Sequence, residues 1–304
     1  MTEAAAFAGY RLLTYRSERG ERAGALIGDN VIDVADATGR PGDATVLGLL
    51  ADWIAAHARL KEVLKAGGGR PLAETHMCAP LPAPGAIYCA GANYSDHAAE
   101  MAARSGSPPT KTERSWHFVK STRAVVGSGA IVALPEASHK VDWEIELAAV
   151  IGRKGKHITV ADALAHVAGY TIANDLSARD LSRRAEVADE SPFKMDWLSH
   201  KNFDGACPLG PWITPAEWID DPQALAMELS INGVTKQQSN TSAMIFSLAE
   251  QIRDLSERIT LWPGDVILTG TPAGVGLSRG EFLTSGDVMR ARIEGLGELV
   301  TTMK

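Results

Sequence analysis

The sequence predicts an α+β protein with a mainly β C-terminal domain, peripheral helices and a small N-terminal α/β domain. Apolar segments of strand length recur after residue 86, and only a few helical patterns interrupt them. A Pro-rich stretch near 70–84 separates them from an N-terminal region with its own strand and helix patterns. With 304 residues, of which 45% are hydrophobic, the chain can form one large and one small domain. We place these domains at residues 1–75 and 76–304.

The N-terminal domain is expected to begin with short strands and to continue into one helix. Strand patterns occupy residues 10–15, 23–27 and 31–34, with polar or Gly-containing turns between them. From residue 44 to 66 the apolar positions keep helical spacing. Asp43 is a candidate cap for this helix, and Gly67 to Gly69 end it.

The C-terminal domain is expected to be rich in strands, with helices at its periphery. Asn232-Gly233 indicates a tight hairpin. The stretch 104–115 is polar enough to form a loop. Helical patterns cover 95–104, 160–166 and 241–258, and strand patterns cover 86–89, 117–120, 144–151, 170–173, 227–231, 266–269 and 288–293.

Charge and cysteine content exclude several classes of protein. The net charge is −7, the pI is about 5.6 and no basic run occurs, which argues against nucleic acid or an anionic membrane as the main partner. Cys78, Cys89 and Cys207 have no C-x-x-C spacing, so we expect reduced thiols in a cytoplasmic protein and no structural zinc. The start of the chain resembles no export signal, and no apolar run is long enough to span a membrane.

Three acidic residues in two short segments are the main candidates for a metal site. Glu144 and Glu146 lie two apart in a strand pattern and therefore share one face, and Asp175 follows the next strand pattern. Carboxylates that lie close together either raise a pKa or bind a cation, and oxygen ligands suit Mg²⁺, Mn²⁺ or Ca²⁺. Spacing alone is equally compatible with the solvated face of an amphipathic strand.

Other polar residues are candidates for catalysis or anion binding. His97 and Glu100 lie three apart in a helical pattern, which fits a proton-transfer pair but also a solvated helix face. Lys201 opens a loop rich in Gly and Pro, where a solvated lysine is equally compatible with the pattern. The Gly-rich turn after residue 268 offers backbone amides and the hydroxyls of Thr269 and Thr271 to an anion. This turn lacks the Gly-Lys-Ser/Thr ending of a nucleotide-binding loop.

The segment after Asp175 offers further polar groups. In S-A-R-D, at 177–180, Arg179 and Asp180 follow Asn174 and Ser177. We interpret this segment as a strand-to-helix turn that Ser177 caps.

Taken together, these motifs resemble the fumarylacetoacetate hydrolase family over roughly residues 86–300. The motifs, in order, are G-A-N-Y-S-D-H-A-A-E-M (91–101), D-W-E-I-E-L-A-A-V-I-G (142–152), G-Y-T-I-A-N-D-L-S-A-R-D (169–180), K-N-F-D-G-A-C-P-L-G-P-W-I (201–213), T-S-A-M-I-F (241–246) and G-D-V-I-L-T-G-T-P-A-G-V-G (264–276). The resemblance implies a mixed β-sandwich roll preceded by the small N-terminal domain of many bacterial members, and a homodimer.

The resemblance also implies roles for individual residues. Glu144, Glu146 and Asp175 match the metal ligands, and His97, Glu100 and Lys201 match catalytic positions. Arg179, Gln237, Gly270 and Thr271 match positions around the substrate. Cys89, Ala90 and Gly91 offer no acidic residue upstream of His97, where the longer, eukaryotic-type members have a fourth acidic ligand. Fumarylacetoacetate itself is therefore not the expected substrate.

The function that follows is hydrolysis of a carbon–carbon bond in a small anionic 2-oxo acid, assisted by Mg²⁺ or Mn²⁺, with Ca²⁺ as a further option. Acylpyruvates and 3-deoxy-2,4-dioxo sugar acids are the expected substrate types. The same residues fit a 2-oxo acid decarboxylase of the oxaloacetate type, a tautomerase or isomerase, or a hydratase, because the pocket rather than the family sets the reaction. A non-catalytic module that a metal stabilises is a further alternative.

Overall fold

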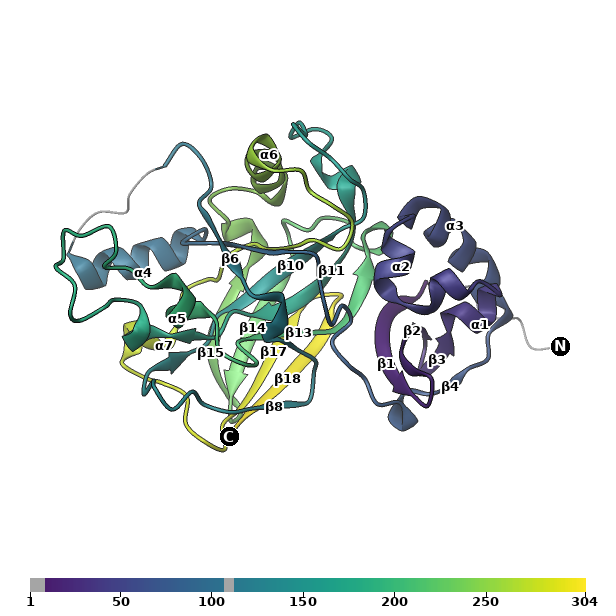
Figure 1. Cartoon of the computed structure of the whole chain (residues 1–304), viewed down its shortest axis with the longest axis horizontal. Coiled ribbons are helices and arrows are strands. Elements are labelled where there is room, and N and C mark those ends of the chain that lie inside the picture. The colour runs from purple at the N-terminus through teal and green to yellow at the C-terminus, as the bar shows by residue number, and fades with distance from the viewer. Residues whose placement is uncertain (1–8, 107–111) are drawn as a thin grey trace.

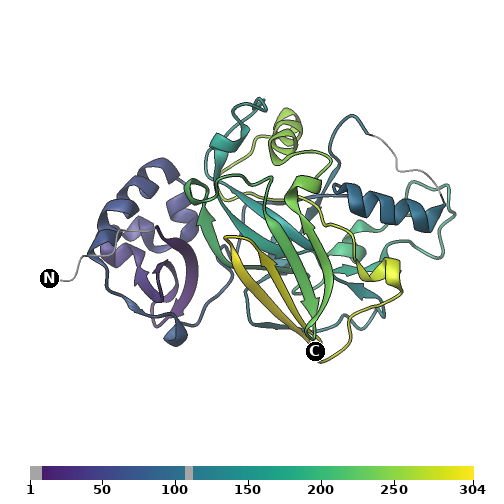
Figure 2. The same ribbon diagram turned by 180° about the vertical axis from the view of Figure 1, so that it is seen from behind.

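The computed structural model describes residues 9–106 and 112–304, and it confirms the mixed α+β class. Figure 1 shows residues 9–75 as a lobe of helices and short strands beside a larger, β-rich body. One long sheet joins the two, in the strand order β4-β3-β2-β1-β13-β11-β10-β16-β5-β6, with β7 paired to β13. A second sheet, β15-β14-β17-β18-β8, lies in the larger body, and Figure 2 shows it from behind.

The N-terminal segment, residues 9–75, contains an antiparallel sheet and several short helices. Its strands are β1 (Arg11–Ser17), β2 (Gly20–Ile27), β3 (Asn30–Asp33) and β4 (Arg70–Pro71). Its helices are α1 (Val34–Thr38), α2 (Val46–Leu50) and α3 (Trp53–Val63), with 3₁₀ turns η1 (Pro41–Ala44), η2 (Leu64–Ala66) and η3 (Leu72–Glu74). The three expected strands are confirmed.

The expected single helix over 44–66 is wrong, because the chain breaks between α2 and α3. Asp52 has φ −136° and ψ 52°, which lie outside the helical region. Thr45, rather than Asp43, caps α2, through a 3.0 Å hydrogen bond from the Gly48 amide to its hydroxyl. The apolar spacing continues across the break because both helices bury the same side against the core.

The C-terminal segment, residues 76–304, supplies most of the strands. They are β5 (Ile87–Ala90), β6 (His117–Lys120), β7 (Val125–Val126), β8 (Ala130–Val132), β9 (Val141–Asp142), β10 (Ile145–Ile151), β11 (Val167–Asn174), β12 (Ser177–Ala178), β13 (Cys207–Pro215), β14 (Ala226–Ile231), β15 (Val234–Asn240), β16 (Val266–Leu268), β17 (Val288–Ile293) and β18 (Gly297–Met303). Every residue of β10 and β11 is buried. The face that carries Glu146 is therefore not a solvated strand face.

Helices surround these sheets, and two of the expected helices are shorter in the structure. The helices are α4 (Ser95–Ser105), α5 (Trp197–Lys201), α6 (Leu248–Arg258) and α7 (Gly276–Arg279), with 3₁₀ turns η4 (Thr122–Ala124), η5 (Ala163–His166), η6 (Arg179–Leu181), η7 (Ala216–Trp218) and η8 (Thr241–Ala243). Only η5 forms within 160–166. The pattern over 241–258 is split, because Ser247 and Glu250 form a capping box that starts α6.

Two local expectations concern connections. Asn232 and Gly233 connect β14 to β15 with φ of 51° and 81°, so the hairpin is confirmed with both turn residues in the left-handed region. Of the expected loop at 104–115, residues 107–111 lie outside the described residues. No helix within 9–106 or 112–304 is both long enough and apolar enough to cross a membrane.

Candidate metal centre and active-site cavity

The three candidate metal ligands converge at one end of the central strand pair. Glu144 directly precedes β10, Glu146 lies within it, and Asp175 directly follows β11. The two strands are antiparallel, with Ile145 opposite Asn174, so the three acids come from neighbouring strand ends. One carboxylate oxygen from each lies within 4.8 Å of the others, and all three side chains are buried. The structure thus joins two segments that the sequence separates by about thirty residues.

Two of these acids are neutralised by buried cations. The Lys201 ammonium lies 2.7 Å from Glu144 Oε2 and 2.6 Å from Asp175 Oδ2. Arg179 donates to the other oxygen of Glu144. Burial alone would raise the pKa of Glu144, but the charges of Lys201 and Arg179 outweigh it and lower that pKa. Lys201 is the last residue of α5 and is buried, so the expected loop position is wrong.

Glu146 differs from the other two acids because it has no cationic partner within the described part of the chain. Its Oε2 accepts a 2.6 Å hydrogen bond from the Gly270 amide. Burial, followed by the charges of Asp175 and Glu144, raises the pKa of Glu146 well above its usual value. Three buried carboxylates with one left unbalanced form a hard, all-oxygen donor set that fits a divalent cation such as Mg²⁺ or Mn²⁺.

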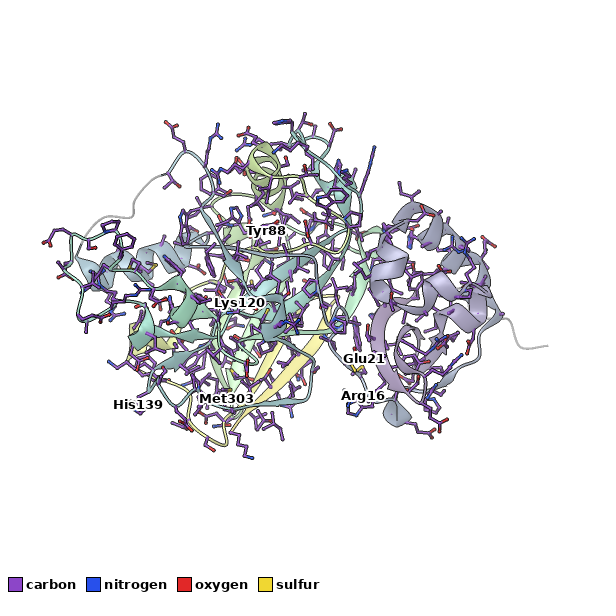
Figure 3. The ribbon with its side chains drawn as sticks, viewed as in Figure 1. Arg16, Glu21, Tyr88, Lys120, His139 and Met303 are labelled. Atoms are coloured by element: carbon purple, nitrogen blue, oxygen red, sulfur yellow. The ribbon has the colours of Figure 1, made fainter. Side chains whose placement is uncertain are left out.

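Lys120 is a buried contributor that the sequence reasoning did not identify. It ends β6, and its ammonium lies 2.5 Å from Asp175 Oδ1 and 3.1 Å from the Leu176 carbonyl. Figure 3 shows it in the middle of the larger body, and its side chain is fully buried. A lysine at the end of an otherwise apolar strand pattern was the available signal. Asp175 therefore has an ammonium group on each oxygen.

Arg179 is held in place by a second acid, Asp142, which the sequence reasoning also missed. Asp142 Oδ2 accepts a 2.8 Å hydrogen bond from Arg179 Nε. Its two oxygens also accept the amides of Gly276 at 2.6 Å and Leu277 at 3.0 Å. The expected helix cap at Ser177 is wrong. This residue lies in β12, and its hydroxyl donates to the Asp175 carbonyl instead.

His97 and Glu100 form a pair on the first turns of α4, where the helical spacing placed them. His97 Nδ1 lies 3.0 Å from Glu100 Oε2, and Glu100 Oε1 accepts a 3.1 Å hydrogen bond from the Gly274 amide. Burial raises the pKa of Glu100, but the hydrogen bonds from His97 and from the Gly274 amide outweigh burial and lower this pKa below its usual value. The carboxylate therefore stays ionised. A charged Glu100 favours the His97 tautomer with a proton on Nδ1, so Nε2 is unprotonated and can accept a proton.

The Gly-rich turn after β16 places Thr271 in the lining of the cavity, whereas Thr269 and the Gly270 amide form hydrogen bonds within the protein. Thr269 donates its hydroxyl to the Leu147 carbonyl at 3.0 Å, so the expectation that it faces an anion is wrong. Gln237 is fully buried and is absent from the residues that line the cavity. Its amide nitrogen donates to Thr271 Oγ1 at 2.8 Å, and its oxygen accepts the Ile145 amide. The Gly270 amide is directed to Glu146.

A cavity of about 630 Å³ brings six of the ten predicted site residues together, whereas Glu100, Asp175, Gln237 and Gly270 do not line it. One end is polar and is lined by His97, Glu144, Glu146, Arg179, Lys201 and Thr271. The remainder is mostly apolar and is lined by Ala90, Gly91, Ala92, Met101, Thr112, Trp116, Phe118, Trp197, His200, Ile245 and Phe246. His97 thus shares one cavity with the acids. The aromatic wall and His200 were not identified from sequence.

The fold and the site define a class of protein: an α+β protein with a buried cluster of three carboxylates at the polar end of a cavity. The model for the fumarylacetoacetate (FAA) hydrolase C-terminal region matches residues 86–304. The chain therefore belongs to the fumarylacetoacetate hydrolase family, as its motifs predicted.

Several curated proteins and solved structures are similar to this chain. Human oxaloacetate tautomerase FAHD2B, mitochondrial, is 42% identical over 233 residues, which cover 76% of this chain and 70% of that protein. Oxaloacetate tautomerase YisK of Bacillus subtilis is 40% identical over 232 residues, covering 75% and 73%. The structure of maleylpyruvate hydrolase from Sphingobium sp. SYK-6 in complex with manganese(II) ion and pyruvate superimposes with a TM-score of 0.76, at 29% identity, covering 96% and 98%.

Proposed function

We propose that this protein is a divalent-metal-dependent enzyme that hydrolyses a carbon–carbon bond in a 2-oxo acid bearing a second carbonyl. The observation that carries the proposal is the shared cavity, which is lined at one end by Glu144 and Glu146 of the three-carboxylate cluster and by His97 of the His97–Glu100 pair. The manganese and pyruvate named for the Sphingobium relative support a metal ion and a 2-oxo acid as the ligands of the present protein.

Glu144, Glu146 and Asp175 would hold the cation, and Mg²⁺ or Mn²⁺ suits their oxygen ligands, with Ca²⁺ as a further option. When bound, the cation supplies Lewis-acid polarisation of a carbonyl oxygen and a template for the substrate. Lys201, at 2.6–2.7 Å from two of these acids, supplies positive charge where negative charge develops on the substrate. Arg179 and Thr271 line the same end and would bind the carboxylate of the substrate.

His97 is the proposed general base. Glu100 accepts a hydrogen bond from the protonated Nδ1 of His97, so Nε2 is the nitrogen that takes a proton from water as the water attacks the second carbonyl. The same Nε2 can then return the proton to the carbon that leaves. Gln237 and Gly270 do not reach the substrate in this arrangement, and we propose that they position Thr271 and Glu146 instead.

Tautomerisation of a 2-oxo acid is the second candidate, because the human and Bacillus relatives are oxaloacetate tautomerases. The same residues suffice for it. His97 Nε2 would take a proton from the carbon next to the 2-oxo group and return it to oxygen, and no water would be needed. Decarboxylation and hydration could use the same metal ligands and the same His97, so they require no additional residue.

The deciding experiment is a substrate assay with product identification. Purified protein is incubated with 2,4-dioxo acids, a 3-deoxy-2,4-dioxo sugar acid and oxaloacetate, with Mg²⁺ or Mn²⁺ and with chelator. Release of pyruvate and a second carboxylic acid supports hydrolysis, and an enol signal that decays without cleavage supports tautomerisation. Full activity in chelator would contradict both, and metal binding without turnover on any substrate would favour the non-catalytic module.

We also propose a homodimer, and a domain boundary near residue 75. The β-rich body carries exposed apolar side chains, including Phe193 on the segment that leads into α5 and Leu198 within α5. Light scattering of the purified protein tests the first proposal, and separate expression of residues 76–304 tests the second.

A further inference from the structure

The wall of the cavity beyond the charged end is a continuous aromatic cluster. Trp197 lies 4.8 Å from Trp116 and 5.2 Å from Phe118, measured between ring centroids. The Phe118 ring lies 5.1 Å from Lys201 Nζ, so the cluster begins beside the acids. Trp116 is 46% exposed, so the cluster extends from the charged end to the surface. A substrate whose 2-oxo acid head lies at the acids would place the rest of its length along these rings.

Within the part of the wall that the structure describes, no lysine or arginine is free of carboxylate partners. Among the lining residues in the described part of the chain, the lysine and arginine cations are Lys201 and Arg179, and each already binds two carboxylates. A second carboxylate on the substrate, placed away from the head, would lose its hydration without gaining a partner. Burying an unpaired charge is strongly unfavourable. The wall therefore disfavours a diacid and favours an uncharged arm.

His200 contributes an imidazole ring to this wall, and that ring has no hydrogen-bond partner among the described residues. It is 6% exposed, and neither ring nitrogen has a hydrogen-bond partner within the described residues. It lines the cavity, and its ring lies 5.5 Å from that of Trp197. Burial, followed by the charges of Lys201 and Arg179, lowers its pKa to about 3, so the ring is neutral near pH 7. A neutral imidazole offers one N–H donor and one acceptor, and buried groups of this kind are usually satisfied.

We propose that the substrate carries, beyond its 2-oxo acid head, a flat and uncharged apolar arm. The arm stacks on Trp197, Trp116 and Phe118, and an oxygen of the arm hydrogen-bonds to His200. This inference rests on the proposed function, because it assumes that the head lies at the acids. A 2,4-dioxo acid with an aryl group, such as 2,4-dioxo-4-phenylbutanoate, has the required chemistry. Oxaloacetate, whose arm ends in a carboxylate, lacks it.

The first test compares substrates that share the head and differ in the arm. The kcat/KM values of 2,4-dioxo-4-phenylbutanoate, 2,4-dioxopentanoate and oxaloacetate are measured with Mg²⁺ by loss of the enol absorbance, which reports hydrolysis and tautomerisation alike. We expect the phenyl compound to exceed the methyl compound by about tenfold or more, since a buried ring adds a large apolar contact. A preference for oxaloacetate, or equal values for both dioxo acids, would overturn the inference and leave the proposed function intact. Absence of metal-dependent turnover or binding for every 2-oxo acid would instead overturn the proposed function.

The second test uses variants of the wall. Trp197→Leu should raise KM for the phenyl compound about tenfold and reduce its advantage over the methyl compound. Trp262→Leu is the matched control, because Trp262 is 52% exposed and does not line the cavity. His200→Phe keeps the ring shape and removes both nitrogens, so KM for the phenyl compound should rise about tenfold. His200→Gln restores a donor and an acceptor and should recover most of that loss.

These variants separate recognition from structural support. If His200 only packed against its neighbours, His200→Phe would be harmless and His200→Gln would be the damaging change. Circular dichroism confirms that each variant folds. If Trp197→Leu fails to fold, the two His200 variants decide the question by themselves. An unchanged ratio of kcat/KM between the phenyl and methyl compounds in both His200 variants would overturn the role of His200.

Discussion

Two groups of paired charges, one in each part of the chain, use the same residue types in opposite environments. In the N-terminal segment, Arg19 and Asp36 pair at 2.6 Å with 55% and 57% of their side chains exposed. Under the cavity, Lys120 and Asp175 pair at 2.5 Å with 0% and 1% exposed. Figure 3 shows the difference in position, since Lys120 lies inside the larger body and the Arg16–Glu21 pair lies near the edge of the N-terminal lobe.

The difference shows that burial, rather than ion pairing itself, makes a charge important here. Exposed charges remain hydrated whether or not they are paired, so an exposed ion pair contributes only about 0–1 kcal/mol to the free energy of unfolding. Buried charges have lost their hydration, so each depends on its partner and shifts the pKa of its neighbours. The buried group also contains Glu146, an acid that has no cationic partner among the described residues, and this leaves the site suited to bind a cation.

The largest effect on stability is expected for Lys120→Met. It leaves Asp175 Oδ1 without its ammonium partner inside the protein, and it should lower the free energy of unfolding by about 3–5 kcal/mol. Arg16→Met is the matched control, because that pair is exposed and 3.8 Å apart, and its effect should stay within about 0.5 kcal/mol. Urea unfolding of the metal-free protein measures both. Equal effects would refute the comparison.

Glu146→Gln should separate metal-dependent activity from stability. Replacing this carboxylate ligand with a neutral amide should reduce metal-dependent turnover on the order of a hundredfold or more. The same change removes an acid whose ionised form is disfavoured by burial and by the charges of Asp175 and Glu144, so the metal-free variant should unfold at an equal or higher temperature than the parent. Activity, metal binding by calorimetry and thermal unfolding are measured together. A large fall in the unfolding temperature without metal would show that Glu146 is a structural charge.

Glu100→Gln should reduce kcat about tenfold with little loss of stability. The amide is uncharged, so it no longer fixes the proton on His97 Nδ1, although it can still accept the Gly274 amide. Glu62→Gln is the control, because Glu62 of α3 forms an exposed ion pair at the same three-residue spacing with Lys65 of η2. If Glu100→Gln turns over at the parent rate, the charge of Glu100 is not needed to fix the tautomer of His97.

Asp33→Asn should give the smallest effect, about 1 kcal/mol, with a defined pH dependence. Asp33 caps α1 and binds Arg22 at 2.6 Å. Burial raises its pKa, but the Arg22 and Tyr15 hydrogen bonds outweigh burial and lower the pKa to about 2. Its stabilisation is therefore fully present above about pH 4, the usual aspartate value, and disappears as the pH falls through 2.

Urea midpoints of Asp33→Asn and the parent chain, compared at pH 7 and pH 2.5, test this sign. The difference between the two proteins should shrink at the lower pH. A difference that grows on acidification would contradict the assignment of the ionised Asp33 as the stabilising form.

Local patterns explain which site residues could be predicted. Glu144 and Glu146 share a face because strand spacing is two, and His97 and Glu100 meet because helical spacing is three to four. Lys120 and Asp142 could not be placed in this way, since the site contacts described above join them to residues from 37 to 135 positions away. His200 was missed because only the fold shows that it lines the cavity. The helix over 44–66 failed for the opposite reason, because two helices that bury one face mimic a single apolar stripe.

The sequence by itself determined the strand and helix types around the site, the family and the identity of the three clustered acids, because each depends on residues close together in the chain. Tertiary structure decided which acid is left without a cation, which lysines are buried, and that aromatic side chains from β6 and α5 wall the cavity. Those properties depend on burial and on distances across separate strands. Dehydration of a charge is fixed only when the whole fold has closed around it.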